Sequence, residues 1–250
     1  MNGSGNTTCF FDACATGGHC PRWRDLLHFE PSMSALNRWF LSGLIFVVAV
    51  DARGEGVIEG TVALPKSRAE AIAPGRYENK TPEAVAAPEP LVAVIYLEGN
   101  FSSTPATNTT IPAKLVQKAF QFSPAVLPVQ AGTAVEFPNF DDSYHNVFSY
   151  SKTKRFDLGR YRKDEKPAAV VFDKPGVVKL YCEIHEHMRA TILVLDTPHF
   201  TKTDTNGNFR LEHLPAGKYT LKAWLDEKTQ LERTVDLSDG ATERVDFAAK

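Results

Sequence analysis

The chain has 250 residues, of which 43% are hydrophobic, and its formal net charge at pH 7 is −2. This length allows one large or two small domains with well-buried cores. The near-neutral charge predicts neither nucleic acid nor an anionic membrane surface as a partner, and the lack of any block of like charges argues against a charged disordered tail.

The first 52 residues differ in composition from the rest. Residues 39–50, WFLSGLIFVVAV, form an apolar run broken only by a serine and a glycine, and this run is shorter than the about 20 residues of a membrane-spanning helix. Arg38 precedes the run, and Val50 and Ala52 stand at the spacing of a cleavage site. The pattern predicts a secretory signal that ends at residue 52. An uncleaved membrane anchor is the alternative.

A signal of ordinary length would begin at Met33, so residues 1–32 need a separate explanation. We interpret them as upstream sequence that is not translated, with Met33 as the true start. The alternative is a small zinc knuckle, although the spacing of its candidate ligands matches no common zinc pattern. Those ligands would be Cys9, Cys14, His19 and Cys20.

Sulfur is scarce beyond the predicted signal, where Cys182 and Met188 are the sulfur-bearing side chains. An exported chain with a single cysteine forms no internal disulfide. A free thiol in an oxidising compartment is open to oxidation unless something occupies it, and a bound metal ion would do so.

Strand-like runs follow one another from residue 57 to the C-terminus. They are rich in β-branched and aromatic residues and are bounded by turn-forming residues. We expect strands on both sides of a turn at residues 130–132 and at residues 57–64, 91–99, 145–150, 168–172, 176–182 and 189–195. Because no segment shows the sustained apolar period of about 3.6 residues that marks a helix, the prediction is an all-β sandwich or barrel.

Two turns are predicted near the C-terminus. Asn206-Gly207 is a dipeptide typical of two-residue hairpins, and strand-like segments lie on both sides of it, at residues 200–204 and 208–214. A second turn is predicted at residues 238–240. Asp204 and the two asparagines after it also resemble the start of a calcium loop, but the later acidic ligand of such a loop is missing, so we favour the turn.

Residues 181–188, YCEIHEHM, concentrate the candidate ligands of the chain. Side chains alternate along a strand, so Cys182 shares the face of the apolar residues before it and points into the sheet. His185 and Met188 follow in a loop, and His145 begins a strand far upstream. A thiolate, two imidazoles and a weakly bound thioether form the ligand set of an electron-transfer copper site, which is the site we predict.

His187 lies inside the same segment. We expect its imidazole to lie at the surface. In the alternative arrangement the ring turns inward, competes with Met188 and lowers the reduction potential.

The spacing Cys-x-x-His-x-x-Met resembles the short ligand loop of amicyanin-type cupredoxins. The stretch GTAVEFPNFDDSYHNVF, residues 132–148, is similar to the segment that leads into the first histidine ligand of that family. The resemblance covers about residues 112–196 and implies a Greek-key β-sandwich. It further implies one type 1 copper ion with His145, Cys182 and His185 as strong ligands, Met188 as the axial ligand and Asn146 as the residue that ties the ligand loops together.

The set HNVFS, FDLG and YCEIHEHM also resembles plastocyanin-like proteins named for methylamine utilisation, a name that establishes no substrate.

The segment TKTDTNGNFRLEHLPAGKYTLKAW, residues 201–224, resembles a transthyretin-like sandwich of the carboxypeptidase-regulatory type. Two earlier strand-like runs, GVIEGTVAL at residues 56–64 and VAVIYLEG at residues 92–99, are similar to strands of that family but lie before the cupredoxin-like stretch. We therefore predict one sandwich domain from residues 53–100 plus 197–250, interrupted by a cupredoxin domain at residues 101–196. Two consecutive domains with an extended N-terminal arm are the alternative.

These features predict a periplasmic or secreted blue-copper protein that carries single electrons between redox partner proteins, without enzymatic activity or stable membrane insertion. The first alternative is a copper carrier or buffer. The second is a scaffold or carbohydrate-binding protein with an incidental metal, whose aromatic platform would be Trp224 and Tyr219. A copper oxidase or nitrite reductase would need a further histidine cluster, for which His199 and His213 alone are left.

Overall fold

The computed structural model describes residues 55–65, 87–99, 101, 112–165 and 169–248. The predicted secretory signal, the start at Met33 and the cysteine-rich segment before it lie outside these residues. Within the described residues every regular element is a strand, which confirms the predicted all-β class. No helix in this part of the chain is long and apolar enough to span a membrane.

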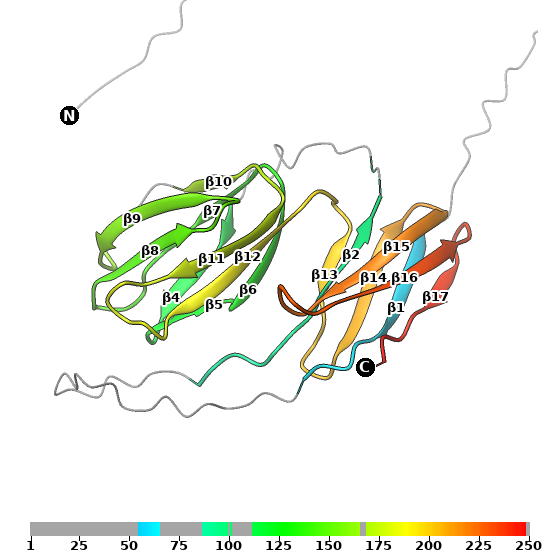
Figure 1. Ribbon diagram of the computed structural model, residues 1–250, viewed down its shortest axis with the longest axis horizontal. Helices are drawn as coiled ribbons and strands as arrows, with labels where there is room; N and C mark the ends of the chain where they lie inside the picture. The colour runs from blue at the N-terminus through cyan, green and yellow to red at the C-terminus, as the bar shows by residue number, and fades with distance from the viewer. Residues whose placement is uncertain (1–54, 66–86, 100, 102–111, 166–168, 249–250) are drawn as a thin grey trace, which may run out of the picture. The chain divides into compact units, whose positions relative to one another are not determined.

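Seventeen strands make up the described part of the chain (Figure 1). In chain order they are β1 (Gly56–Thr61), β2 (Val94–Glu98), β3 (Ala113–Lys114), β4 (Val116–Lys118), β5 (Gln121–Ser123), β6 (Val126–Gln130), β7 (Thr133–Glu136), β8 (His145–Tyr150), β9 (Arg155–Tyr161), β10 (Val170–Phe172), β11 (Gly176–Tyr181), β12 (Arg189–Leu195), β13 (Phe200–Lys202), β14 (Asn208–Leu214), β15 (Gly217–Trp224), β16 (Gln230–Leu237) and β17 (Thr242–Arg244).

Strands β3 to β12 form the body that we call the first sandwich. Its larger sheet has the order β6-β12-β11-β8-β9, and a smaller sheet has the order β10-β7-β3. One buried cluster draws apolar side chains from both sheets, among them Val135 of β7, Val147 of β8 and Leu180 of β11. Burial of this shared apolar surface is the main force that holds the two sheets face to face.

Strands β1, β2 and β13 to β17 form the second sandwich. Its sheets have the orders β14-β1-β17 and β13-β2-β15-β16. Strand β1 pairs antiparallel with β14 and parallel with β17, while β2 lies between β13 and β15. A second apolar cluster fills the space between these sheets and includes Ile58, Leu97 and Leu221. Strands from before residue 100 therefore complete sheets whose other strands come from after residue 199.

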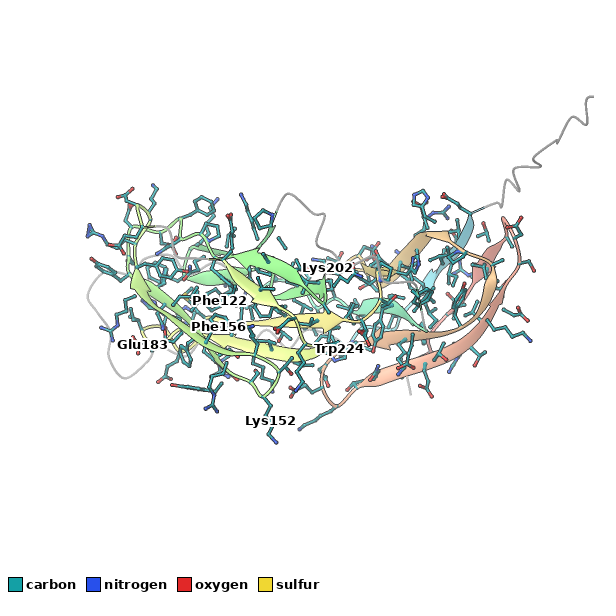
Figure 2. The ribbon with its side chains drawn as sticks, turned by 90° about the horizontal axis from the view of Figure 1, so that it is seen from above. Phe122, Lys152, Phe156, Glu183, Lys202 and Trp224 are labelled. Carbon is teal, nitrogen blue, oxygen red and sulfur yellow. The ribbon has the colours of Figure 1, made fainter. Side chains whose placement is uncertain are left out.

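Trp224, labelled in Figure 2, does not provide an open platform for a sugar ring. It is 7% exposed and packs in a small buried cluster with Val94, Leu193 and Leu195. Tyr219 stacks on Phe101 at 5.5 Å between ring centroids. Trp224 thus does not suit the carbohydrate-binding alternative, because the face that a sugar would need is used for packing, as the favoured scaffold interpretation expects.

The turn at Asn206-Gly207 is present, but the predicted hairpin is wrong. Strand β13 pairs with β2, and β14 pairs with β1, so the turn carries the chain from one sheet to the other. Asp204 Oδ1 accepts the backbone N–H groups of Asn206 and Asn208, each at 2.8 Å. Gly207 has a φ of +85°, and a Cβ there would lie 2.1 Å from the carbonyl oxygen of Val62. The asparagines and Asp204 thus serve the turn, as we expected in preference to a calcium loop.

Strand β9 was not among the expected strands. Its exposed positions carry Arg155, Asp157 and Arg160, and it lies at the edge of the larger sheet. Edge strands carry charged residues that discourage pairing with another chain. Phe156 and Leu158 alternate with charged residues here, but the alternation is short and ends at Gly159 and Arg160.

Candidate metal centre

Three of the predicted ligands lie together at one end of the first sandwich. His145 is the first residue of β8, Cys182 directly follows β11, and His185 lies in the loop between β11 and β12. Strand β11 is hydrogen-bonded to both β8 and β12, which brings the distant His145 beside the loop. Glu183, the residue after Cys182, marks this end of the sandwich in Figure 2.

One ligand atom from each of His145, Cys182 and His185 lies within 4.8 Å of the others, and we call these three residues the ligand group. The two Nδ1 atoms are 3.0 Å apart, and Cys182 Sγ is 3.8 Å from His185 Nδ1. A borderline metal ion binds imidazole nitrogen at about 2.0 Å and thiolate sulfur at about 2.3 Å. Each separation is shorter than the sum of two such bonds, so one ion can contact both atoms of either pair.

A local irregularity in β8 helps to bury the group. The register of β8 against β9 shifts between Asn146 and Phe148, and His145, Asn146 and Val147 are all buried in succession. A regular strand would turn alternate side chains to opposite faces. Bulges of this kind are frequent beside functional sites because they re-aim a side chain.

Met188, the predicted axial ligand, is 1% exposed and packs in the same core cluster as Cys182. Its backbone N–H donates to the carbonyl oxygen of His185 at 2.9 Å, which tightens the loop between the two residues. The buried thioether therefore belongs to the apolar surroundings of the ligand group.

Asn146 links three parts of the first sandwich. Its Oδ1 accepts the backbone N–H of Glu183 at 2.8 Å, and its Nδ2 donates to Asp157 Oδ1 at 3.0 Å. The Asn146 side chain is 1% exposed, whereas its partners Asp157 and Glu183 are exposed residues. Asn146 thereby ties the start of β8 to the loop after Cys182 and to β9.

Asp141 is a neighbour of the group that the sequence analysis missed. Its Oδ2 lies 2.9 Å from His145 Nε2. Because a carboxylate accepts and does not donate, His145 carries a proton on Nε2, and its Nδ1 faces the rest of the group. Asp141 stands four residues before His145, a spacing that could have drawn attention to it, but Asp142 is adjacent and only the fold distinguishes the two.

The electrostatics of the group favour a thiolate. Burial raises the pKa of the Cys182 thiol, but hydrogen bonds from the side chains of His145 and His185 and from the backbone N–H groups of Asn146 and His185 outweigh this and lower the pKa to about 5. Burial lowers the pKa of His145, and contacts with Cys182 and Asp141 overcome that effect and raise it. The thiolate is the form of cysteine that binds metal.

The remaining histidines of the described residues stand apart from the group. His187 is exposed, as expected, and its Nε2 donates to the carbonyl oxygen of Phe120 at 3.0 Å. His199 packs edge-on against Phe101, and His213 pairs with Glu55 at the surface. Among the described residues, the ligand group is the one cluster of three or more His, Cys, Asp or Glu side chains that could hold a metal ion.

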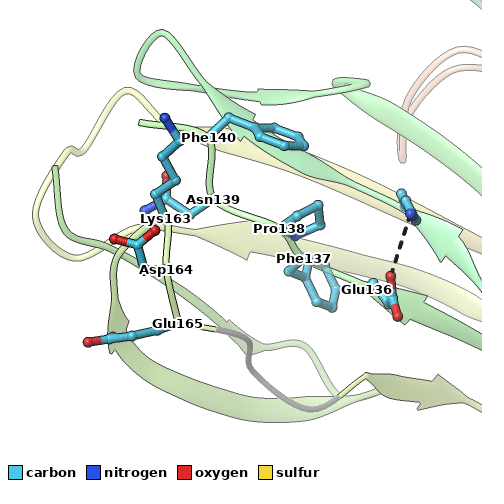
Figure 3. Close-up of a pocket in the computed structure, with 9 residues that line it drawn as sticks. Glu136, Phe137, Pro138, Asn139, Phe140, Lys163, Asp164 and Glu165 are labelled. Atoms are coloured by element: carbon cyan, nitrogen blue, oxygen red, sulfur yellow. Dashed lines mark ion pairs between the residues drawn. The ribbon is translucent and has the colours of Figure 1, made fainter. Parts of the chain in front are cut away.

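A pocket of about 470 Å³ lies elsewhere on the first sandwich (Figure 3). It is lined by Lys114, residues 136–140 and residues 163–165, and Lys114 forms an ion pair with Glu136 at 3.8 Å. None of the ligand group lines this pocket. This pocket and the candidate metal centre therefore lie in different places on the first sandwich.

Residues 188–250 match the family model described as a carboxypeptidase regulatory-like domain. This agrees with the resemblance seen in the C-terminal sequence. A search of curated proteins found no match.

Cupredoxins are among the similar solved structures. A copper-containing nitrite reductase from Thermus scotoductus SA-01 is 26% identical over 35% of this chain and 23% of that one, with a TM-score of 0.33. A purple cupredoxin from Nitrosopumilus maritimus is 25% identical over 33% of this chain and 99% of that one, with a TM-score of 0.30. An oxidised amicyanin mutant is 19% identical over 36% of this chain and 88% of that one, with a TM-score of 0.32. The chain thus spans about a quarter of the nitrite reductase.

Proposed function

We propose that this chain is a type 1 copper protein that carries single electrons between redox partner proteins in the periplasm or outside the cell. The observation that carries the proposal is the ligand group itself, in which a buried thiol and one nitrogen of each of two imidazoles lie within 4.8 Å of one another. A thiolate and two imidazoles, with a weak thioether, suit copper in both of its oxidation states.

In the proposed centre, His145 Nδ1, Cys182 Sγ and His185 Nδ1 are the strong ligands and Met188 is the weak axial ligand of one copper ion. Bound copper would supply a one-electron redox couple. The chain contributes a rigid frame, because the ligands stand at strand ends and in a short loop. Asn146 supports that frame through its bond to the backbone of Glu183. A frame that holds the same geometry in both oxidation states favours fast electron transfer.

The burial of the group supports a role without catalysis. His145 is 0% exposed, Cys182 is 4% exposed and Met188 is 1% exposed. Catalytic metal sites keep a position open for water or substrate, and this arrangement presents few routes to one. His185 is the partly exposed member of the group, and we propose that electrons enter and leave through its imidazole.

We also propose that the sandwich of residues 53–100 plus 197–250 is one domain that is interrupted by the copper domain of residues 101–196. The pairing of β1 with β14 and β17, and of β2 with β13 and β15, supports this arrangement. In this interpretation the second sandwich is a scaffold. Removal of a signal that ends at residue 52 would deliver both domains outside the cytoplasm.

The test is a metal analysis, a visible spectrum and a redox titration of the purified exported chain. We expect one copper ion per chain, an intense thiolate-to-copper charge-transfer band and reversible one-electron cycling with the copper retained. Loss of copper on reduction, or its transfer to a chelator, would favour the carrier function instead. A chain without the band would refute the blue-copper proposal.

A further inference from the structure

A strained turn lies beside the ligand group. Strands β4 and β5 are joined by Ala119 and Phe120 alone, with Lys118 paired to Gln121, and φ is +50° at Ala119 and +60° at Phe120. Two-residue turns with positive φ at both central positions normally use Asn and Gly. A bulky residue in this conformation persists only where the surrounding structure holds it, and such strain gathers at functional sites.

The carboxylate of Asp141 holds the turn from one side. Its Oδ1 accepts the backbone N–H of Ala119 at 2.7 Å, and its Oδ2 accepts that of Phe120 at 3.0 Å. The same Oδ2 contacts His145 Nε2 at 2.9 Å. One side chain therefore fixes both the orientation of a proposed copper ligand and the position of the turn.

His187 holds the turn from the other side. Its Nε2 donates to the carbonyl oxygen of Phe120 at 3.0 Å. Because His187 belongs to the loop that carries His185, this bond joins the turn to the ligand loop directly. His187 thus has a structural partner although it stands outside the ligand group.

The ring held in this way covers the group. The Phe120 ring is edge-on to His145, with centroids 5.4 Å apart and an interplanar angle of 87°. It is also edge-on to His185, at 4.9 Å and 83°. Phe120 itself is 9% exposed, so a largely buried apolar ring packs against both imidazoles.

We propose that Phe120 is the residue that closes the copper centre to small outside ligands, and that Asp141 and His187 are the positioning residues that keep it closed. The identity of the metal rests on the proposed function, but the closure itself does not. A closed centre passes electrons while it excludes anions and other small molecules that would bind a metal ion.

The first test needs no metal. The full chain is freed of metal and treated with iodoacetamide, and alkylation of Cys182 is followed by mass spectrometry of its peptide. Thiol reactivity depends on access as well as on ionisation, so Phe120→Ala should react at least about tenfold faster than the wild type. Phe120→Leu keeps most of the apolar bulk and should stay close to the wild-type rate. Phe140→Ala, at an exposed phenylalanine outside these ring contacts, is the matched control and should change nothing.

The positioning residues are tested in the same assay. His187→Ala and Asp141→Asn should give rates between those of the wild type and Phe120→Ala. His187→Gln retains an N–H that can reach the Phe120 carbonyl and should restore the slow rate. A mere loss of stability would not produce this rescue. If Phe120→Ala is poorly folded by circular dichroism, the comparison of His187→Ala with His187→Gln decides the proposal.

The second test uses the copper-loaded chain and sodium azide, followed in the visible spectrum. The wild-type spectrum should not respond, whereas the Phe120→Ala spectrum should change as azide binds. Equal alkylation rates and equal azide responses in the wild type and Phe120→Ala would overturn the closure. A wild-type chain that takes up no copper would overturn the proposed function, and the alkylation comparison would still decide whether Phe120 closes the group.

Discussion

Each of the two sandwiches has an apolar core, but their buried polar groups differ. Five of the buried polar side chains of the described residues lie on the first sandwich, and two lie near the second: Gln117, Asn139, His145, Asn146 and Ser149, against Thr197 and Thr203. A buried polar group costs free energy unless it is hydrogen-bonded. The second sandwich largely avoids that cost, which is what a scaffold would do.

The first sandwich accepts the cost and offsets it with hydrogen bonds around the ligand group. Asp141 and Asn146 together contact a candidate ligand, the loop after Cys182 and the strained turn. The difference suggests a division of roles, in which one core supplies stability and the other supplies a chemical site.

The largest expected effect comes from Cys182→Ser. In the proposed copper centre the intense visible band would arise from charge transfer between thiolate sulfur and copper, so its loss should be complete. The variant should keep the β-type circular dichroism of the wild type, because neither apolar core depends on this one side chain. If the variant kept the band unchanged, the site would not depend on the thiol of the first sandwich, and the proposed division of roles between the two sandwiches would be wrong.

The matching change in the second sandwich is Leu221→Ala. Leu221 is 0% exposed and lies in the second apolar cluster, and truncation of a buried leucine to alanine costs about 2–5 kcal/mol. We expect the free energy of unfolding, measured with urea, to fall by that amount while the visible band of the folded, copper-loaded chain stays unchanged. A changed band would show that the two roles are not separate.

A smaller effect than those of the two substitutions is expected when the pH of the metal-free chain is changed. The pKa of Cys182 is lowered from the ordinary 9.0 to about 5, so the thiolate should persist as the pH falls and be lost near pH 5. Its contribution to stability is then complete above about pH 9 and disappears as the pH falls through about 5. The rate of Cys182 alkylation against pH measures the midpoint, and the urea-unfolded chain is the control, with a midpoint near 9.

The smallest expected effect is that of Met188→Leu. The axial bond is weak, so copper should remain bound and the band should remain, with a changed reduction potential. Leucine also preserves most of the buried volume at this position, which limits the loss of stability. Loss of copper from this variant, measured by metal analysis after dialysis, would mean that the thioether is a main ligand.

The candidate ligands were visible in the sequence because soft ligand types are rare in the chain and stand at a regular spacing. Cys182 and Met188 are the sulfur-bearing residues beyond residue 52, and His185 lies between them. The alternation of strand residues also gave the direction of Cys182, which is 4% exposed. Local periodicity was therefore enough to predict the all-β class and the burial of the thiol.

The supports of the site were not visible in the same way. The turn residues Ala119 and Phe120 have no turn-forming character, and their conformation depends on Asp141, which is distant in the sequence. Asn206-Gly207 has strong turn character, yet the turn chemistry does not determine which strands the flanking segments join. Both features are set by tertiary contacts, which a local reading of the sequence does not contain.

The position of β1 affects the order in which the molecule folds. Strands β3 to β12 come from one continuous stretch of chain, whereas β1 pairs with β14 and β17 near the C-terminus. Contacts between distant segments carry a larger closure cost, so they form late. Since β2 pairs with β13, a folded first sandwich already brings the two flanks of the second into reach. The first sandwich would thus act as a template for the second, and β1 would stay without its final partners until the last strand has been made.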